Sequence, residues 1–419
     1  MLSSRGLKNV KELERPWRFT PAAAYDPDTN PTGLISFGMA ENRPMRAEIV
    51  KYINEKVIFN PDSISYRSSA TSINTQLPAI AAGHLDKVLN TCKPIQPDHV
   101  FVADSASSLG NLLGYNLAER GEAILVNRPV YGRFELDYGV EAGVEIFYAD
   151  TGTEEAFTPD AVKKYEEALQ EAEARGVKIR AVLLVNPHNP VGRCYPVDTI
   201  RDIARFCNKH ELHLISDEIY ASCVFDSGDP EATPFTSILS LDLGELIDPN
   251  LVHVLYGFSK DFASGGLRLG FLVSQNQQLH QACKMASPSQ AAVTIGTTIL
   301  KDQDFVSTFT AKSRESLAAN YRLITSLLNQ EGINYIKKGN AGFFIYVDFS
   351  PFLVSDGRSR QEQEFELAER FSKAGVFLHP GEEHGKDLGW FRFVFSHDER
   401  TLREGFRRLL VALKGSTYQ

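Results

Sequence analysis

Residues 180–186, Arg180-Ala181-Val182-Leu183-Leu184-Val185-Asn186, form an apolar run that ends directly at an Asn-Pro turn. A continuous Val/Leu run of this kind is typical of a strand that is buried on both faces of a parallel sheet. Similar short runs occur between residues 98 and 275, and helical patterns separate them. These runs are His99–Ala103, Ala123–Val126, Val144–Tyr148, Leu212–Ser216, Val252–Tyr256 and Leu269–Ser274. We therefore predict an α/β fold with a seven-stranded, mostly parallel sheet.

Two of the intervening segments have clear helix signals. Thr158-Pro159-Asp160 suits a helix start with Thr158 as the N-cap, and Gly176 suits its end. We expect this helix to cover Ala161–Arg175. A second helix should place Ile200, Ile203, Phe206 and Cys207 on one apolar face before the strand at Leu212.

The C-terminal part has a different pattern. Residues 301–350 predict a long helix followed by a strand at Gly342–Phe349, residues 359–374 a helix, and Trp390–Phe395 an alternating strand. The first 45 residues are expected to be irregular because prolines interrupt them at Pro16, Pro21, Pro27, Pro31 and Pro44. We predict a large domain over residues 46–300 and a smaller α+β domain made of residues 1–45 and 301–419.

The net charge and the cysteines argue against several classes of partner and ligand. The 419 residues carry a net charge of −9, which argues against nucleic acid and anionic membranes as partners. The five cysteines are scattered without a CxxC pair, so neither a disulfide framework nor a zinc site is expected, and we predict no metal. We see no signal peptide and no apolar stretch of about 18 residues, and we expect a cytoplasmic protein.

The segment after the strand Val252–Tyr256 carries a lysine, in Ser259-Lys260-Asp261, and then Arg268 in a glycine-rich turn. Ligands of such sheets bind beyond the carboxyl ends of the strands. A desolvated lysine amine can form a Schiff base, and an arginine suits a phosphate. An exposed lysine beside a loop arginine is the alternative interpretation of this segment by itself.

Two further polar segments follow predicted strands. Asn186-Pro187-His188-Asn189-Pro190 forms a tight turn, from which the amide of Asn189 can donate to a phenolate-like oxygen. Asp217 can pair with a protonated ring nitrogen, and Tyr220 follows it at helical spacing. An ordinary turn and a helix cap are the alternatives. Three such sites at three strand ends are much less expected by chance than any one of them.

In this combination, the chain resembles the class I/II aminotransferase family of pyridoxal-5′-phosphate (PLP) enzymes over nearly its whole length. Within the family, it is most similar to the 1-aminocyclopropane-1-carboxylate (ACC) synthase-like branch. The branch resemblance rests on residues 30–42 (NPTGLISFGMAEN), on residues 216–225 (SDEIYASCVF) and on Ser259-Lys260-Asp261. The resemblance implies the PLP-dependent transferase fold (fold type I), PLP as the cofactor, an amino acid substrate, and a homodimer with shared active sites.

The resemblance also implies a role for individual residues in holding the cofactor. Lys260 would form the Schiff base and move the Cα proton, while Asp217 would keep the ring nitrogen protonated so that the ring acts as an electron sink. Asn189 and Tyr220 would contact the phenolic oxygen. The phosphate would be held by the helix start at Ser105, Ala106 and Ser107, together with Ser259 and Arg268.

The remaining matches concern the ring face, the substrate and the partner subunit. Tyr131 would stack on the ring, although a plain core tyrosine is the alternative. Arg392 would clamp the α-carboxylate, unless it faces outward from a half-exposed strand. Met39 and Glu41 would line the entrance, and Tyr66 would reach the phosphate in the partner subunit.

The chain departs from the family pattern at three places. The serine usually found three residues before the lysine is Gly257, and the proline of the Lys–Arg turn is Gly265 or Gly266. The glycine expected after Tyr66 is not evident in Arg67–Ser72.

The leading functional hypothesis is an aminotransferase acting on an α-amino acid. The alternative is an ACC-synthase-like lyase that cleaves a C–S bond in an S-substituted amino acid or S-adenosylmethionine. A non-catalytic PLP-binding protein is a remote third hypothesis, because such a protein would be expected to lose Lys260, Asp217 or Arg392, and all three are present.

Overall fold

The computed structural model of the protein describes residues 1–14, 17, 25–66, 72–355, 357–385 and 388–414. Its main sheet confirms the predicted seven strands, each within one residue of the expected bounds. They are β2 (Val100–Ala103), β3 (Ala123–Asn127), β4 (Glu145–Ala149), β5 (Ile179–Val185), β6 (His213–Asp217), β7 (Val252–Gly257) and β8 (Gly270–Ser274). The strand order is β2-β8-β7-β6-β5-β3-β4. Strand β8 runs antiparallel to β2 and β7, and the other neighbours are parallel.

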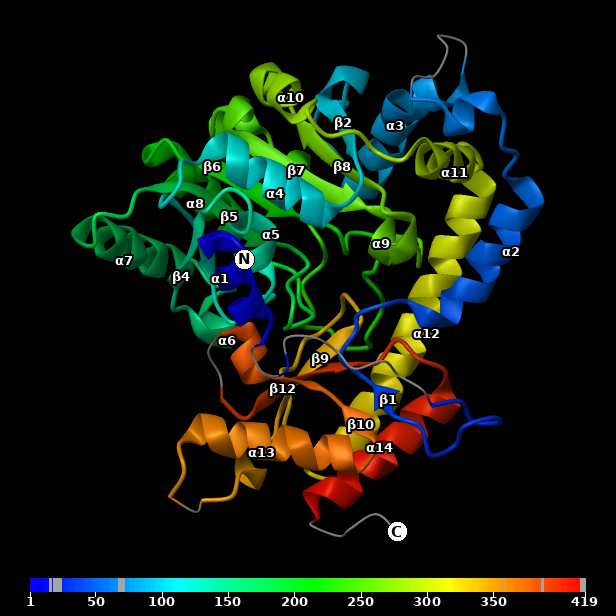
Figure 1. Ribbon diagram of the computed structural model, residues 1–419, viewed down its shortest axis with the longest axis vertical. Helices are drawn as coiled ribbons and strands as arrows, with labels where there is room; N and C mark the ends of the chain where they lie inside the picture. Colours follow the sequence, from blue (N-terminus) through cyan, green and yellow to red (C-terminus); the bar gives the residue numbers. More distant parts are fainter. Residues whose placement is uncertain (15–16, 18–24, 67–71, 356, 386–387, 415–419) are drawn as a thin grey trace.

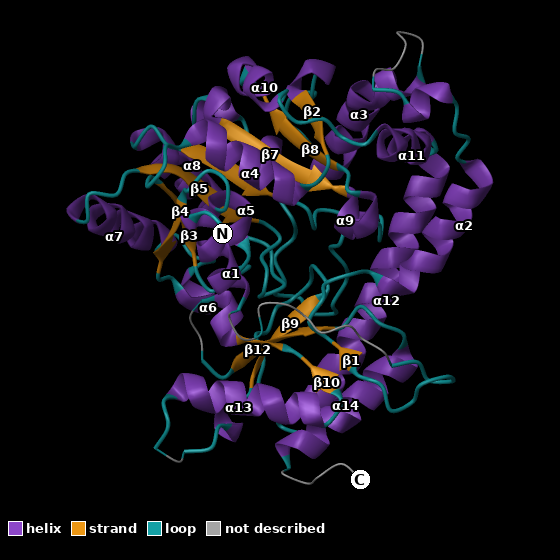
Figure 2. Ribbon diagram, in the orientation of Figure 1, coloured by secondary structure: helices purple, strands orange, loops and turns teal. Residues whose placement is uncertain are grey.

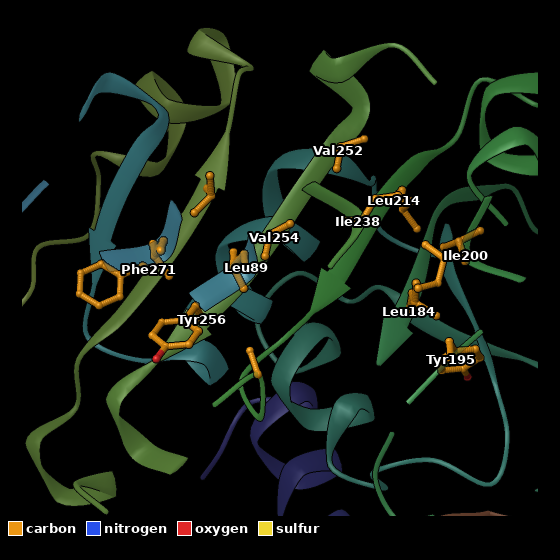
Figure 3. Close-up of a cluster of buried hydrophobic side chains, with 14 of the residues drawn as sticks. Leu89, Leu184, Tyr195, Ile200, Leu214, Ile238, Val252, Val254, Tyr256 and Phe271 are labelled. Atoms are coloured by element: carbon orange, nitrogen blue, oxygen red, sulfur yellow. The ribbon is translucent and has the colours of Figure 1, made fainter. Parts of the chain in front are cut away.

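Helices cover both faces of this sheet (Figure 2). Leu184 of β5 packs in a cluster with α3 (Leu77–Leu89), α7 (Ala161–Ala174), α8 (Val197–Lys209) and α11 (Gln290–Lys301). Figure 3 shows Leu184 in this cluster near Ile200 and Leu214. Its neighbour Leu183 packs on the opposite face, with α4 (Ala106–Leu117), α5 (Phe134–Gly139) and α10 (Gln277–Cys283). Burial on both faces explains why the sequence of β5 is continuously apolar.

The two predicted helices of this region are present, and α7 begins at Ala161 as predicted, but its N-cap differs from expectation. Helix α7 is followed by Gly176, which has a left-handed φ of 70°. The prediction that Thr158 caps the helix is wrong, because Asp160 is the residue before α7 and makes no side-chain cap bond. The Thr158 hydroxyl instead donates to the carbonyl of Glu155 (2.9 Å), where the short α6 (Gly152–Glu155) ends.

The C-terminal lobe contains α12 (Gln303–Gln330) and an antiparallel sheet of β11 (His379–Pro380), β12 (Trp390–Val394) and β9 (Phe344–Asp348). Helices α13 (Arg360–Lys373) and α14 (Glu399–Leu413) lie beside this sheet (Figure 1). The N-terminal segment joins the lobe because β1 (Ile35–Ser36) pairs in parallel with β10 (Val376–Phe377). Helix α2 (Arg46–Lys56) packs on the start of α12, where the rings of Tyr52 and Phe305 stack at 3.7 Å. The division into residues 46–300 and the remainder stays a prediction.

The expectation of an irregular N-terminus is wrong for its first residues. Helix α1 covers Ser4–Leu13, and the hydroxyl of Ser3 accepts a hydrogen bond from the N–H of Gly6 (3.2 Å). Serine is a favoured N-cap, and no proline precedes residue 16, so a helix can form there. Pro16 and Pro21 lie outside the described residues. Within the described ranges, no helix is long and apolar enough to cross a membrane.

The contact between α14 and the N-terminal segment gives a test of the packing. A methyl group on Gly405 would overlap with the ring of Phe37, which is fully buried and stacks on Phe393 at 4.3 Å. We therefore expect Gly405→Ala to lower the free energy of unfolding by about 1–3 kcal/mol, the usual cost of overpacking. Denaturant unfolding or the melting temperature measures the change.

Gly83 provides the matched control, because it lies in α3 and an added methyl group there would have nothing within 4 Å. Gly83→Ala should stabilise the protein slightly, by up to about 1 kcal/mol, through helix propensity. Equal effects of the two substitutions would contradict the packing described for Phe37.

Candidate active site

One cavity of about 380 Å³ lies beyond the carboxyl ends of the parallel strands and against the C-terminal lobe. It collects every site residue predicted from the sequence except Tyr66. The predicted residues that line it are Met39, Glu41, Ser105, Ala106, Ser107, Tyr131, Asn189, Asp217, Tyr220, Ser259, Lys260, Arg268 and Arg392. Side chains far apart in the sequence meet here because parallel strands end at the same edge of a sheet.

Lys260 lies in the short helix α9 (Phe258–Asp261), directly after the buried strand β7. Its amine donates a hydrogen bond to the carbonyl of Ala40 (2.8 Å) and lies 5.6 Å from the ring centre of Tyr220. Desolvation and the charge of Arg392 lower the pKa of Lys260 to about 8, while Glu41 raises it. A substantial fraction of this amine is therefore neutral near pH 8 and able to act as a nucleophile.

Asp217 ends β6 and is 6% exposed. Burial raises the pKa of its carboxyl group to about 7, and a hydrogen bond from the backbone N–H of Ile219 (3.3 Å) opposes the shift. A carboxylate in this state gains from a cationic partner, since pairing restores the charge that desolvation disfavours.

Arg392 is turned into the cavity and not outward, because it is only 4% exposed. Its guanidinium donates to the amide oxygen of Asn189 (3.0 Å) and to the carbonyl of Gly38 (2.6 Å). Neither partner carries a charge, so the buried cation can still gain from an anion.

A pair of glycines lies where strands β7 and β8 approach the cavity, and Gly257 is part of its wall. Gly257 of β7 is paired with Gly270 of β8, and a methyl group on Gly270 would lie 2.7 Å from the carbonyl carbon of Ser105. A methyl group on Gly257 would approach the carbonyl oxygen of Leu269 at 3.1 Å. This tight packing is a physical reason why the serine of the family pattern is replaced by Gly257.

The start of α4 lies directly against Gly270 of this pair. Ser105 caps the helix by accepting the N–H of Ser108 (3.0 Å), so the first-turn N–H groups of Ala106 and Ser107 belong to a helix N-terminus at the cavity wall. Arg268 has a left-handed φ of 54° and donates to the carbonyl of Gly265 (3.1 Å). A helix N-terminus next to an arginine is well suited to a phosphate group.

Several residues of the cavity wall are not predicted from the sequence. Asp137 of α5 accepts a hydrogen bond from the hydroxyl of Ser107 (3.4 Å), and burial raises its pKa to about 6. Arg133, His379 and Glu383 also line the cavity. Asp137 could have been found from its position on the helical pattern that follows Tyr131, whereas His379 and Glu383 come from a two-residue strand and a short turn without a motif.

Tyr66 is fully exposed and is not among the residues that line the cavity. The residues that follow it, 67–71, lie outside the described part of the chain, and they include most of the stretch in which the family's glycine was not evident. The role of Tyr66 toward a partner subunit therefore stays a prediction.

The groups of the cavity fit PLP by their chemistry. The amine with a lowered pKa suits the aldehyde of the cofactor, and the carboxyl group with a raised pKa suits its ring nitrogen. The helix N-terminus with its neighbouring arginine suits the phosphate. The hydroxyl of Tyr138, which also lines the cavity, is buried without a hydrogen-bond partner among the described residues.

Comparisons with known proteins agree with this geometry. Residues 87–409 match the family described as aminotransferase class I and II. The chain is 32% identical to 1-aminocyclopropane-1-carboxylate synthase-like protein 1 of Mus musculus, over 99% of this chain and 84% of that protein. It is 29% identical to the probable aminotransferase aclI of Aspergillus oryzae, over 98% of each chain.

Among solved structures, the fold is similar to that of the aspartate aminotransferase from Thermus thermophilus with maleate. The TM-score is 0.67 at 20% identity, and the match covers 98% of this chain and 97% of that one. The family match over most of the length, the fold and the relatives together identify the chain as a member of the class I and II aminotransferase family of PLP-dependent enzymes.

Proposed function

We propose that this chain binds PLP through Lys260 and acts on an α-amino acid by removing its Cα proton, as an aminotransferase. The observation that carries the proposal is the amine of Lys260, whose pKa is lowered to about 8 in the same cavity as Asp217 and Arg392. Bound PLP supplies an electron-withdrawing ring that makes the Cα proton of an attached amino acid acidic. The other requirements fall on the side chains of the cavity.

Lys260 is suited to two tasks in this proposal. Its amine would hold the cofactor covalently, and once released it would accept the Cα proton, since a neutral amine is a competent base near its pKa. Asp217 would hold the ring nitrogen in its protonated form, at the end of β6. Ser105, Ala106, Ser107, Ser259 and Arg268 would hold the phosphate.

Asn189 and Tyr220 would contact the phenolic oxygen of the cofactor. Because Arg392 occupies the amide oxygen of Asn189, the NH₂ group is the end left to donate to that oxygen. Tyr131 would cover the ring face. Arg392 would bind the substrate α-carboxylate, and Met39 and Glu41 would lie at the entrance.

We further propose a homodimer with active sites shared through Tyr66. The segment before Tyr66 supports an interface, because it exposes several large apolar side chains. Ile58, Phe59 and Ile64 are 81%, 52% and 83% exposed. Clusters of exposed apolar residues commonly mark protein–protein contacts.

A carbon–sulfur lyase of the ACC-synthase-like kind is the second candidate. The segment that carries the branch resemblance lies at the cavity, because Gly38, Met39, Ala40 and Glu41 form part of its wall. The relative from Mus musculus carries the name of this branch. Both candidates share the Cα deprotonation and differ in what leaves the substrate afterwards.

Product identification across a panel of amino acids, including S-substituted ones and S-adenosylmethionine, separates the candidates. An aminotransferase should give a 2-oxo acid and pyridoxamine phosphate. A lyase on S-substituted amino acids should instead give pyruvate or 2-oxobutyrate with ammonia and a thiol. Lys260→Ala is the control and should lose both the products and the visible absorbance of the lysine-bound cofactor. A protein without any product or spectral change would contradict both candidates and favour a non-catalytic PLP-binding protein.

Removal of the guanidinium tests the α-carboxylate clamp. Arg392→Ala should raise the KM for amino acids by about 10- to 150-fold, the equivalent of the 1.5–3 kcal/mol of a charge-assisted contact. Arg392→Lys keeps the charge but loses the two-pronged geometry, so its KM should rise less. Steady-state kinetics with both variants give the answer, and an unchanged KM in Arg392→Ala would place the clamp elsewhere.

The raised pKa of Asp217 predicts a pH-dependent cost in the cofactor-free protein. Its pKa is near the usual 3.8 in the unfolded chain and about 7 in the folded one. Below about pH 4, the group is protonated in both states and does not lower the stability of the folded state. As the pH rises from about 4 to about 7, the folded state loses stability relative to the unfolded state, in total by on the order of 1–4 kcal/mol.

Asp217→Asn removes this cost. The melting temperature of the cofactor-free variant, minus that of the cofactor-free wild type, should be larger at pH 8 than at pH 5. The same variant should bind PLP more weakly because the ring nitrogen loses its counter-charge. A melting-temperature difference that does not depend on pH would show that Asp217 is not strongly desolvated.

A further inference from the structure

Asp261 is a buried carboxyl group next to Lys260 for which the proposed function has no use. It is 3% exposed and does not line the cavity. One oxygen accepts the backbone N–H of Ser222 (3.1 Å), and the other accepts the thiol of Cys223 (2.9 Å). The hydroxyl of Tyr256 in β7 is a third hydrogen-bond partner.

These contacts join two segments that both reach the cavity. The turn at residues 220–223 carries Tyr220, and the N–H of Cys223 closes it on the carbonyl of Tyr220 (2.9 Å). The helical turn α9 carries Lys260. Asp261 is therefore a bridge between the backbone behind Tyr220 and the backbone behind Lys260.

The far sides of the bridge are also fixed. The ring of Tyr220 makes edge-on contacts with Phe343 and Phe344, at 5.4 and 5.3 Å between centres. Arg314 of α12 donates to the carbonyl of Ser222 (2.9 Å), and His84 of α3 contacts the hydroxyl of Tyr256 (3.2 Å). Between these outer contacts, the carboxyl group of Asp261 links the two segments directly, beside a longer contact of 3.5 Å between the hydroxyls of Ser222 and Tyr256.

The type of side chain matters at this bridge. Ser222 and Cys223 both offer a hydrogen, so the residue between them must accept on each of its two arms. A carboxylate does this, and although burial raises the pKa of Asp261, the hydrogen bonds that it accepts from the turn at residues 220–223 oppose this shift and favour the ionised form. An amide of the same size accepts on one arm and donates on the other. The amide would leave a buried donor facing a donor, which costs free energy and pushes the two turns apart.

We propose that Asp261 is a positioning residue, which fixes Lys260 relative to Tyr220 by holding the turn at residues 220–223 against α9. The inference rests on the proposed attachment of PLP to Lys260. It assigns to Asp261 an effect on the cofactor's lysine linkage without direct contact with cofactor or substrate.

The consequence is measurable as a change in the pH at which the visible absorbance of the lysine-bound cofactor titrates. A hydroxyl of Tyr220 that donates to the cofactor's phenolic oxygen favours the form in which the linking nitrogen has lost its proton. Loosening the bridge weakens this hydrogen bond, so the midpoint should rise. The charged groups that face Lys260 remain in place in all of the variants: Glu41 before α2, Asp217 at the end of β6 and Arg392 in β12. The thiol of Cys223 in the turn also faces Lys260, and it is kept in Asp261→Asn.

The experiment is a spectrophotometric pH titration of the PLP-loaded protein. Asp261→Asn should raise the midpoint by about half a pH unit or more, on the scale by which lost hydrogen bonds shift pKa values. Cys223→Ala removes one donor and should shift the midpoint in the same direction by less. Cys223→Ser keeps a donor and should restore it toward the wild-type value.

Glu364→Gln is the matched control, since Glu364 is also a buried carboxyl group that accepts two backbone N–H groups, those of Glu382 (3.1 Å) and Gly389 (2.5 Å). It should lower the melting temperature without moving the midpoint. The inference is overturned if Asp261→Asn and Cys223→Ala lower the melting temperature but titrate like the wild type. If Asp261→Asn does not fold, Cys223→Ala and Cys223→Ser decide the question by themselves.

Failure of the proposed function has a different signature. In that case, the wild type shows no visible absorbance with PLP, or Lys260→Ala retains it. An absorbance that depends on Lys260 but has an unchanged midpoint in the bridge variants contradicts only the positioning role of Asp261.

Discussion

Desolvation of charged groups in one cavity is the constraint on which the rest of this structure depends. Burial shifts Lys260, Asp217 and Arg392 toward their neutral forms, and it is the largest cause of the shift for each of them. A fold can keep such groups only if the surrounding core supplies enough stability, because isolated buried charges are expensive. The three-layer packing of the main sheet is the source of that stability, and a ligand with complementary charges reduces the cost. The buried charges therefore lower the stability of the protein by themselves, and a ligand that binds them stabilises the folded state.

The sequence was most informative where a pattern repeats over many residues. The apolar run of β5 predicted a strand buried on both faces, and the six similar runs predicted the remaining strands of the sheet. Local signals were less reliable. Threonine is a favoured N-cap residue, yet the hydroxyl of Thr158 donates to the end of the preceding α6, and Asp160 is the residue before α7. The prolines that predict an irregular N-terminal segment begin only at Pro16, so they say nothing about the preceding residues, where α1 forms.

The site shows the same division. Asn189, Asp217 and Lys260 could be predicted because each follows a strand in a recognisable segment, and Arg392 because its charge interrupts an apolar strand. Asp137, His379 and Glu383 could not, since the tertiary fold alone brings them to the cavity. Asp261 is an intermediate case. The sequence shows that it is next to Lys260, but its hydrogen bond with Ser222 joins residues 39 positions apart and depends on the packing of two loops.

The hydrogen bond from Lys260 to Ala40 has a mechanical consequence. Ala40 belongs to the segment that continues from β1, and β1 is part of the C-terminal lobe through β10. The amine therefore links the main sheet to the C-terminal lobe through this hydrogen bond. A covalent bond from this nitrogen to a cofactor would remove hydrogens of the amine, so it would weaken this one contact between the sheet and the lobe. Because coupling between two binding events is reciprocal, a ligand that separates Ala40 from Lys260 would favour attachment of the cofactor to the lysine. A ligand that strengthens the contact between them would disfavour it.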